Sequence, residues 1–156
     1  MNRDSLIIII GWLITSTLLI IFTPKEKIRQ AIVVFMFKQL LTWLLGLTVA
    51  ELGLIEYPVR SFAKATKTSF DFEYFIYPAF CVLFNLHYPR TKKLIVEFLY
   101  YFSFCTALTI IEIIVEKNTN IINYIHWTWY ITWASFLITF YASRKFYLWF
   151  FKVKDQ

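Results

Sequence analysis

The stretch LIVEFLYYFSFCTALTIIEIIV, residues 94 to 115, is a long apolar run that follows Lys93 and ends before Glu116 and Lys117. A hydrocarbon core about 30 Å thick is crossed by roughly 20 mainly apolar residues in an α-helix. This run therefore predicts a transmembrane helix. The rest of the chain agrees, since 59% of its 156 residues are hydrophobic and the mean hydropathy is +0.58, whereas soluble proteins average about 45 to 50% apolar residues.

Four more apolar runs predict an all-α fold, a polytopic transmembrane helical bundle of about five spans in a single domain covering residues 1–156. The expected spans are residues 6–22, 28–55, 70–87, 94–115 and 124–143. The first is interpreted as a retained span because no small-residue cleavage site follows it. Pro58 and Pro89 end the second and third spans, and Pro78 predicts a kink within the third. The aromatic segment 146–151 is expected at the headgroup level.

The orientation of the bundle is predicted from its basic residues. Across five spans, ten Lys and Arg residues flank one side of the membrane and five flank the other. The richer side, with segments 25–29, 90–93 and 144–154, is expected in the cytoplasm. The N-terminus and the loops at 57–69 and 116–123 are then outside, and the C-terminus is cytoplasmic. The loop at 57–69 fits both a basic amphipathic turn on the membrane surface and a solvated loop.

Polar and small residues recur three or four positions apart within three of the spans, so that each set shares one helical face. These sets are Glu97, Tyr101, Cys105, Thr109, Glu112 and Glu116 in the fourth span; Thr128, Thr132, Ser135, Thr139 and Ser143 in the fifth; and Thr42, Gly46, Ala50 and Gly53 in the second. The small-residue face predicts close helix packing. The hydroxyl face is compatible with packing and with a polar lining.

Ionisable residues inside spans normally face protein or a water-filled cavity, because exposure to lipid costs several kcal/mol. The candidate binding cluster lies toward the outer side of the spans. It comprises Glu51, Glu56, Arg60, Glu73, Glu112, Glu116 and His126. Such a cluster could hold or relay protons, or bind a cation or a cationic headgroup. The alternative is a structural network of salt bridges with Arg60 and Lys117.

A second set of candidates lies on the cytoplasmic side: Lys38, Asn85, His87 and Glu97. Lys38 is expected to extend back to water or to meet Glu97. A single His at an interface is more often a structural hydrogen-bonding residue than a ligand, which applies to His87 and His126.

Several classes of function have little support in the sequence. Cys81 and Cys105 have no metal-ligand spacing and are expected to be buried free thiols. Three glycines are too few for a Gly-rich nucleotide site, and no hydrolase or metalloprotease motif is present. No catalytic residue, metal or cofactor is assigned, and an enzyme is the less favoured class. The formal charge of +6 comes from clusters that orient helices, so no nucleic-acid partner is expected.

Five segments carry a resemblance to a known family. They are ELGLIEYPVR at 51–60, FDFEYFIYP at 70–78, Phe84-Asn85 with Tyr88-Pro89, Glu112 with Glu116-Lys117, and Trp127-Thr128-Trp129. From the second span onward the chain resembles a family of small, uncharacterised multi-pass membrane proteins of spore-forming Gram-positive bacteria, bacilli and clostridia. The resemblance implies a bacterial cytoplasmic membrane, in a cell capable of sporulation, and brings no molecular function with it.

Three functions remain open at this point. The first is a small module that binds or transports an ion, a proton or a lipid headgroup, and it requires a cavity reached by Glu51 and Glu112 together. The second is a structural or assembly subunit, in a homo-oligomer or a larger membrane complex. The third is an enzyme acting on a lipid-linked substrate, which requires a His or carboxylate pair facing the bilayer. In all three the lipid bilayer is a partner.

Overall fold

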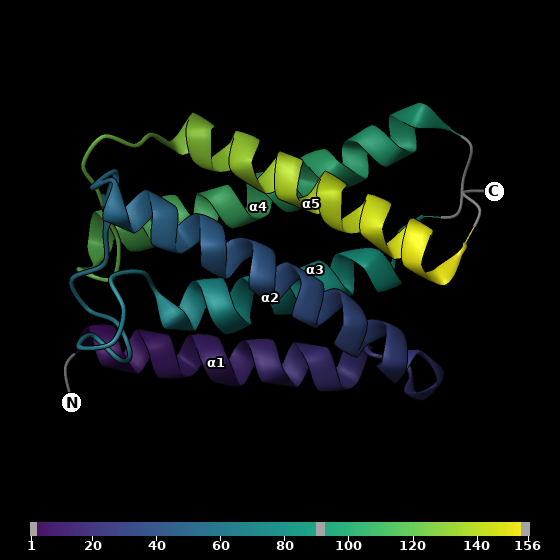
Figure 1. The fold of residues 1–156 in the computed structure, drawn as a ribbon, viewed down its shortest axis with the longest axis horizontal. Coiled ribbons are helices and arrows are strands. Elements are labelled where there is room, and N and C mark those ends of the chain that lie inside the picture. The colour runs from purple at the N-terminus through teal and green to yellow at the C-terminus, as the bar shows by residue number, and fades with distance from the viewer. Residues whose placement is uncertain (1–2, 90–92, 154–156) are drawn as a thin grey trace.

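The computed structural model describes residues 3–89 and 93–153, which form a bundle of helices aligned along one long axis (Figure 1). The elements are α1 (Arg3–Phe22), the 3-10 turn η1 (Lys25–Lys27), α2 (Ile28–Glu51), β1 (Ile55–Glu56), the π-helical segment η2 (Phe70–Ile76), α3 (Tyr77–Leu86), α4 (Leu94–Asn118), β2 (Asn123–Tyr124) and α5 (Trp129–Phe151). The all-α expectation is therefore confirmed.

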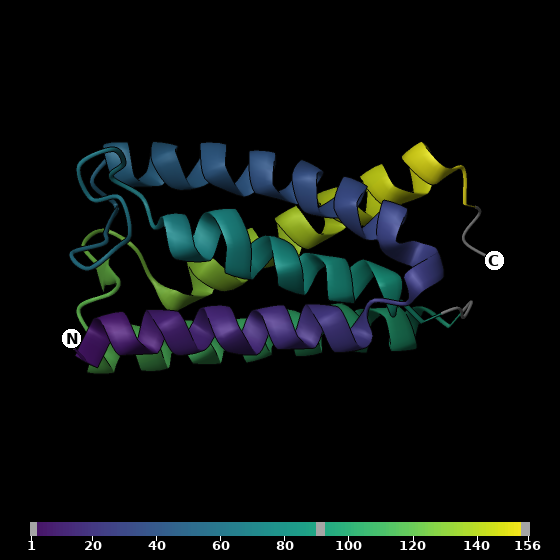
Figure 2. The same ribbon diagram turned by 90° about the horizontal axis from the view of Figure 1, so that it is seen from below.

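The short helix formed by η2 and α3 lies at the centre of the bundle. It packs against α1, α2 and α5, and the Tyr100 hydroxyl of α4 donates to the Phe84 carbonyl at 3.0 Å. Figures 1 and 2 both show it enclosed between α2 and α1. A helix that is apolar around its whole circumference is stable only when it is buried on all sides. Pro78, where a kink is expected, stands where the π-helical segment gives way to the α-helix.

α2 packs on this central helix through its small-residue face. Its buried positions recur every four residues, and three of them are Thr42, Gly46 and Ala50, which confirms the packing face predicted from the sequence. Gly53 is an exception, because α2 ends at Glu51 instead of Ile55. The Gly53 φ of +66° and the bond from the Leu54 amide to the Val49 carbonyl form a left-handed C-terminal cap of the kind that glycine favours.

The loops after α2 and α4 join to form a cap over one end of the bundle. Residues 55–56 pair with residues 123–124 in a short antiparallel ribbon, and the Val59 amide donates to the Asn120 carbonyl at 3.0 Å. The start of α1 is tied to the same end, since the Asp4 carboxylate accepts from the Asn120 amide at 3.3 Å. Asp71 accepts from Trp12 of α1 and from Ser61 of the loop. The cap therefore connects elements that are far apart in sequence.

α5 differs from the predicted fifth span at both ends. It begins at Trp129 and not at Tyr124, because Tyr124 lies in the ribbon. It also continues through the aromatic segment 146–151, which is helical. Phe146 stacks on Phe37 of α2 with ring centroids 3.9 Å apart, and the Tyr147 hydroxyl donates to Gln30 at 2.8 Å. These contacts hold α5 against α2 at the end of the bundle opposite the cap.

Three helical segments within residues 3–89 and 93–153 are long and apolar enough to cross a membrane: Arg3–Phe22, Lys25–Glu51 and Leu94–Asn118. Most of their surface is not buried by the rest of the protein. Large aliphatic side chains such as Leu13 and Ile20 are exposed along it. A monomeric soluble protein rarely exposes so extended an apolar surface, so the exterior is compatible with lipid.

Candidate functional site

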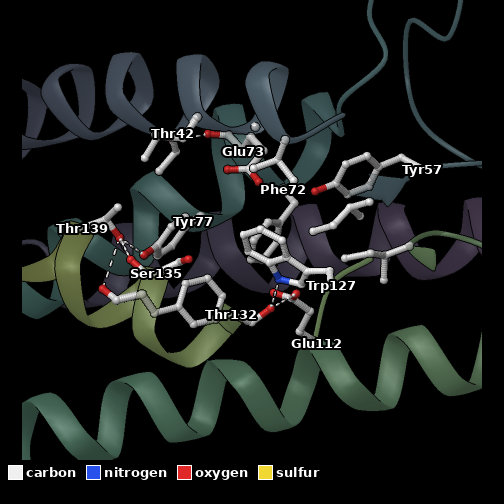
Figure 3. Close-up of a pocket in the computed structure, with 16 residues that line it drawn as sticks. Thr42, Tyr57, Phe72, Glu73, Tyr77, Glu112, Trp127, Thr132, Ser135 and Thr139 are labelled. Carbon is white, nitrogen blue, oxygen red and sulfur yellow. Dashed lines mark hydrogen bonds between the residues drawn. The ribbon is translucent and has the colours of Figure 1, made fainter. Parts of the chain in front are cut away.

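A cavity of about 180 Å³ lies beneath the cap, between α2, η2 and α5. Figure 3 shows the side chains that line it. Its polar lining comes from α2, η2, α3, α4, α5 and two loops of the cap: Thr42, Tyr57, Glu73, Tyr77, Glu112, Trp127, Thr132, Ser135 and Thr139. α2 and α5 touch at the opposite end of the bundle, through Phe37 and Phe146. The cavity occupies the space between their other ends.

Glu112 enters the cavity from α4 and is held in place by three neighbours. The Tyr124 hydroxyl donates to its Oε1 at 2.5 Å, and the Thr132 hydroxyl donates to the same oxygen at 3.0 Å. Trp127 in turn donates its indole N–H to the Thr132 Oγ1 at 2.8 Å. Glu112 is only 9% exposed, so these hydrogen bonds offset part of the cost of burying a carboxyl group. Its position is fixed before any ligand binds.

Glu73 enters from the opposite side of the cavity, as Figure 3 shows. Its backbone is anchored to α2, because the Thr42 hydroxyl lies 2.7 Å from the Glu73 carbonyl oxygen. Its side chain packs against Gly46, where a Cβ would lie 2.9 Å from the Glu73 Cγ. The carboxylate forms no hydrogen bond or ion pair with any other residue in the described ranges. Unlike Glu112, it offers both oxygens to the cavity.

Tyr57 lies at the edge of the cavity next to the cap and is almost fully buried. Burial raises the pKa of its phenol well above the ordinary value of about 10. Its hydroxyl, which points into the cavity in Figure 3, is therefore a neutral hydrogen-bonding group at physiological pH. No pattern in the sequence identifies Tyr57 as a lining residue, since it stands beside the Pro58 that was expected to end the second span.

Lys38 does not behave as expected from the sequence. It is 0% exposed, and it reaches neither water nor Glu97. Its Nζ lies 4.0 Å from the centroid of the Tyr77 ring and 4.8 Å from that of Phe140. It has no hydrogen-bond partner among the described residues. Cation–π contacts of this kind stabilise a desolvated ammonium group by about 2 kcal/mol. Tyr77 also lines the cavity, so it separates the cavity from the buried ammonium group of Lys38.

One part of the hydroxyl face of α5 lines the cavity, and another part packs against a neighbouring helix. Toward the cap, Thr132, Ser135 and Thr139 line the cavity. Farther from the cap the same face packs against α3. There the Cys81 thiol donates to the Ser143 hydroxyl at 2.9 Å. The Asn85 amide donates to the same hydroxyl at 3.2 Å. Asn85 is therefore a packing residue in the interior and not an interfacial one.

Most other members of the predicted cluster lie apart from the cavity. Glu51 forms an ion pair with Lys67 at 2.9 Å on the exposed surface, so the cavity shared by Glu51 and Glu112 that the binding function was expected to require is not observed. The carboxyl group that shares a cavity with Glu112 is that of Glu73. Glu56 and His126 are exposed. Glu116 lines a separate groove on the outside of α4. The sequence places the carboxylates at one level of the bundle, but the direction of each side chain depends on how its helix is rotated.

Arg60 has a structural role in the cap. Its guanidinium donates to three backbone carbonyls of its own loop, those of Tyr57, Ala63 and Thr66. Neither Arg60 nor Lys117 forms a salt bridge with another residue of the described ranges, so the alternative of an ionic network around them is not observed.

On the cytoplasmic side of the predicted topology, the remaining candidates do not assemble into a site. His87 is exposed, with its Nδ1 3.1 Å from the Leu83 carbonyl oxygen, and Glu97 is partly exposed. Within the described ranges, no group of three His, Cys, Asp or Glu side chains is arranged to hold a metal ion.

Comparison of the chain with protein-family models, with curated proteins and with solved structures finds no match. The resemblance to small membrane proteins of spore-forming bacteria therefore stays a prediction. The function is therefore inferred from the cavity and from Glu73 and Glu112, which line it.

Proposed function

We propose that the protein crosses a bacterial cytoplasmic membrane about five times, with the capped end outside and the C-terminus in the cytoplasm. The three long apolar helices support this proposal. Trp129 and Trp149 add support for α5. They are 57% and 74% exposed and stand about 30 Å apart at 1.5 Å per residue, which matches the spacing of the aromatic belts on either side of a bilayer. The orientation depends on basic residues, of which Arg90, Lys92 and Lys154 lie outside the described residues.

The function that we propose is binding of a small cationic group in the cavity between α2, η2 and α5. One observation carries it: Glu73 and Glu112 line the same cavity from opposite sides, and no Lys or Arg of the described ranges pairs with either of them. Two carboxylates in a medium of low dielectric repel each other unless a cation or a shared proton compensates them. Lys38 interacts electrostatically with Glu73, but its ammonium group packs on the Tyr77 ring and forms no ion pair with either carboxyl group. Both carboxyl groups therefore remain available to a cationic ligand.

The size of the cavity narrows the kind of ligand. A volume of about 180 Å³ is below the roughly 300 to 1,000 Å³ of pockets that enclose a drug-sized molecule. The cavity therefore suits a hydrated ion or the charged head of a larger molecule. The hydroxyl groups of Tyr57, Tyr77 and Thr139 supply further oxygen atoms around such a group.

Carbodiimide labelling tests this proposal. Dicyclohexylcarbodiimide partitions into membranes and reacts with carboxyl groups in apolar surroundings, and labelled sites can be quantified by peptide mass spectrometry. In phosphatidylcholine nanodiscs we expect labelling at Glu73 and Glu112. We also expect methylammonium, sodium or calcium chloride to reduce that labelling at constant ionic strength.

Glu116 is the internal control, since it lies on the same helix one turn beyond Glu112 and lines a different surface. Protection of Glu73 and Glu112 without protection of Glu116 would support the site. Equal labelling with and without all three cations would overturn the proposal.

A structural or assembly role is the second candidate, and a groove between α4 and α5 favours it. Its lining is apolar and mostly aromatic: Phe98, Tyr101, Phe102, Trp133, Leu137, Ile138 and Tyr141. Size-exclusion chromatography with light scattering tests it, because Trp133→Ala should dissociate an oligomer formed through this groove. An enzyme on a lipid-linked substrate has less support, since neither His87 nor His126 lines any of the cavities described for this chain.

A further inference from the structure

A second and larger cavity lies on the other side of Glu112, between α1 and α4. Its volume is about 320 Å³. Most of its lining is aliphatic, with Ile7 and Ile14 from α1 and Leu108, Ile111 and Val115 from α4. This size falls within the range of pockets that bind small organic ligands. The composition of its walls suits a hydrocarbon chain.

Most polar groups of the second cavity lie toward the cap. Tyr57, Ser69 and Asp71 lie where it meets the cap, and Glu112 lies partway along it, whereas the deeper part is lined by Ile76 and Phe80 together with the hydroxyl of Thr15. Asp71 is already engaged, because its carboxylate accepts from Trp12 and Ser61. The cavity therefore changes from polar to apolar with increasing depth, as a lipid leaflet does from its headgroups to its chains.

The two cavities share a wall. Tyr57, Phe72, Glu112 and Ile122 line both of them. A molecule whose chain lies between α1 and α4 can bring its polar end to Glu112, which also lines the cavity that Glu73 enters. Without this shared wall, the two cavities would be unrelated features of the bundle.

The depth of Glu112 suits the junction between a lipid head and its chain. α4 has 25 residues and is about 37 Å long, so it extends roughly 4 Å beyond each side of a 30 Å hydrocarbon core. Glu112 precedes the last residue, Asn118, by six positions, or about 9 Å. Its side chain then lies about 5 Å below the hydrocarbon boundary on the capped side.

We propose that both cavities bind one amphiphile, with a long alkyl chain between α1 and α4 and a protonated primary amine between Glu112 and Glu73. This inference rests on the proposed cation site and identifies the class of its ligand. An ammonium group has three N–H donors and one positive charge. It can therefore donate hydrogen bonds to the free oxygens of Glu73 and Glu112 and offset negative charge on their carboxyl groups.

The amine must provide most of the selectivity. A chain that moves from the bilayer into an apolar cavity exchanges one hydrocarbon environment for another, so it gains little hydrophobic free energy. Charge-assisted hydrogen bonds to a carboxylate contribute about 1.5 to 3 kcal/mol each. An alcohol with the same chain is therefore expected to bind at least about tenfold more weakly.

Photocrosslinking in phosphatidylcholine nanodiscs tests the inference. The probe is dodecylamine with a diazirine in the middle of its chain, and the labelled residues are mapped by mass spectrometry. We expect saturable labelling of α1 and α4 around Ile14 and Leu108. Dodecylamine should compete with the probe, and dodecanol should not.

Two tryptophan substitutions provide a matched pair. Ile111→Trp fills the second cavity, whereas Ile110→Trp places the same side chain on the outer surface of α4; both isoleucines are 51% exposed. We expect Ile111→Trp to reduce saturable labelling about tenfold or more and Ile110→Trp to leave it unchanged. Ile8→Trp fills the same cavity from α1 and serves if Ile111→Trp does not fold.

The outcomes separate this inference from the proposed function. Dodecanol competing as well as dodecylamine, or normal labelling of the Ile111→Trp protein, would exclude the amphiphile. The cation site would still stand if methylammonium protects Glu73 and Glu112 from carbodiimide. If Glu112→Gln leaves labelling unchanged and no cation protects the carboxylates, both proposals are overturned.

Discussion

Gly46 of α2 and Glu73 of η2 are in direct contact, because a Cβ atom at position 46 would lie 2.9 Å from the Glu73 Cγ and 3.1 Å from its Cδ. The hydroxyl oxygen of Thr68 would be equally close, at 2.8 Å. The missing side chain of Gly46 thus makes room for the base of the Glu73 side chain. A residue that the sequence identifies only as part of a packing face also sets the position of a cavity carboxylate.

Gly46→Ala should therefore destabilise the protein. Overpacking of a close contact costs about 1 to 3 kcal/mol, and the better helix propensity of alanine recovers only about 1 kcal/mol. The free energy of unfolding in mixed detergent micelles measures the difference. Gly11→Ala is the control, since its Cβ would meet only the end of the Ile76 side chain, at 3.3 Å. A Gly46→Ala protein as stable as this control would disprove the close contact.

Tyr124→Phe should lower stability and release Glu112. The substitution removes the 2.5 Å hydrogen bond to the carboxylate, and hydrogen bonds to charged groups contribute about 1.5 to 3 kcal/mol. Tyr124 is partly exposed, so the lower end of that range is expected. Tyr130→Phe on the exposed side of α5 should have no effect. Equal unfolding midpoints for the two variants would contradict a positioning role for Tyr124.

Lys38→Met should leave the free energy of unfolding unchanged or raise it. The ammonium group is fully buried and has no hydrogen-bond partner in the described ranges, and replacing a buried charge with an apolar side chain of similar size is often neutral or stabilising by about 1 to 4 kcal/mol. Lys38→Ala should instead cost about 2 to 5 kcal/mol, because it opens a cavity. Marked destabilisation by the methionine variant would show that the charge itself supports the fold.

The stability of the cap should fall at alkaline pH. Because burial raises the pKa of Tyr57, the folded protein retains this proton at pH values where the unfolded chain has lost it. The unfolded tyrosine titrates at about pH 10, so this group has no effect below that value and lowers stability as the pH rises above it. Tyr57→Phe should reduce the loss of unfolding free energy between about pH 9 and about pH 11. Tyr141→Phe, at an exposed position, should leave that loss of unfolding free energy unchanged.

Cysteine labelling tests the proposed orientation. Lys67 in the cap loop and Lys152 at the end of α5 are both exposed, and the native Cys81 and Cys105 are buried, so their background labelling should be low. A membrane-impermeant maleimide should modify Lys67→Cys in intact cells and modify Lys152→Cys only after lysis. The reverse pattern would invert the topology.

The sequence predicts the helices better than their ends. Apolar runs and polar periodicity identify five helices and the inward face of α4 around Cys105 and Glu112. They do not reveal that Tyr124 pairs with Ile55, because strand pairing across distant loops leaves no local pattern. The central position of α3 is also hidden, since a uniformly apolar helix has no polar face to orient it.

The candidate residues show a similar division. Glu73 and Glu112, both members of the predicted cluster, line one cavity, whereas Glu51 is included because it lies at the same depth and faces the surface. Depth can be counted along a helix, whereas rotation about the helix axis depends on its neighbours. Lys38 is misjudged for another reason: two aromatic rings, Tyr77 and Phe140, provide an interior environment that the flexibility of a lysine side chain does not indicate.

The ribbon between β1 and β2 also imposes an order on biosynthesis. A chain is synthesised from its N-terminus, so α4 and Glu112 emerge before Tyr124, Trp127 and Thr132, which later hold that carboxylate. During this interval Glu112 lacks these hydrogen-bond donors. Pairing of residues 123–124 with residues 55–56 then closes the cap and brings Tyr124 to the carboxyl group.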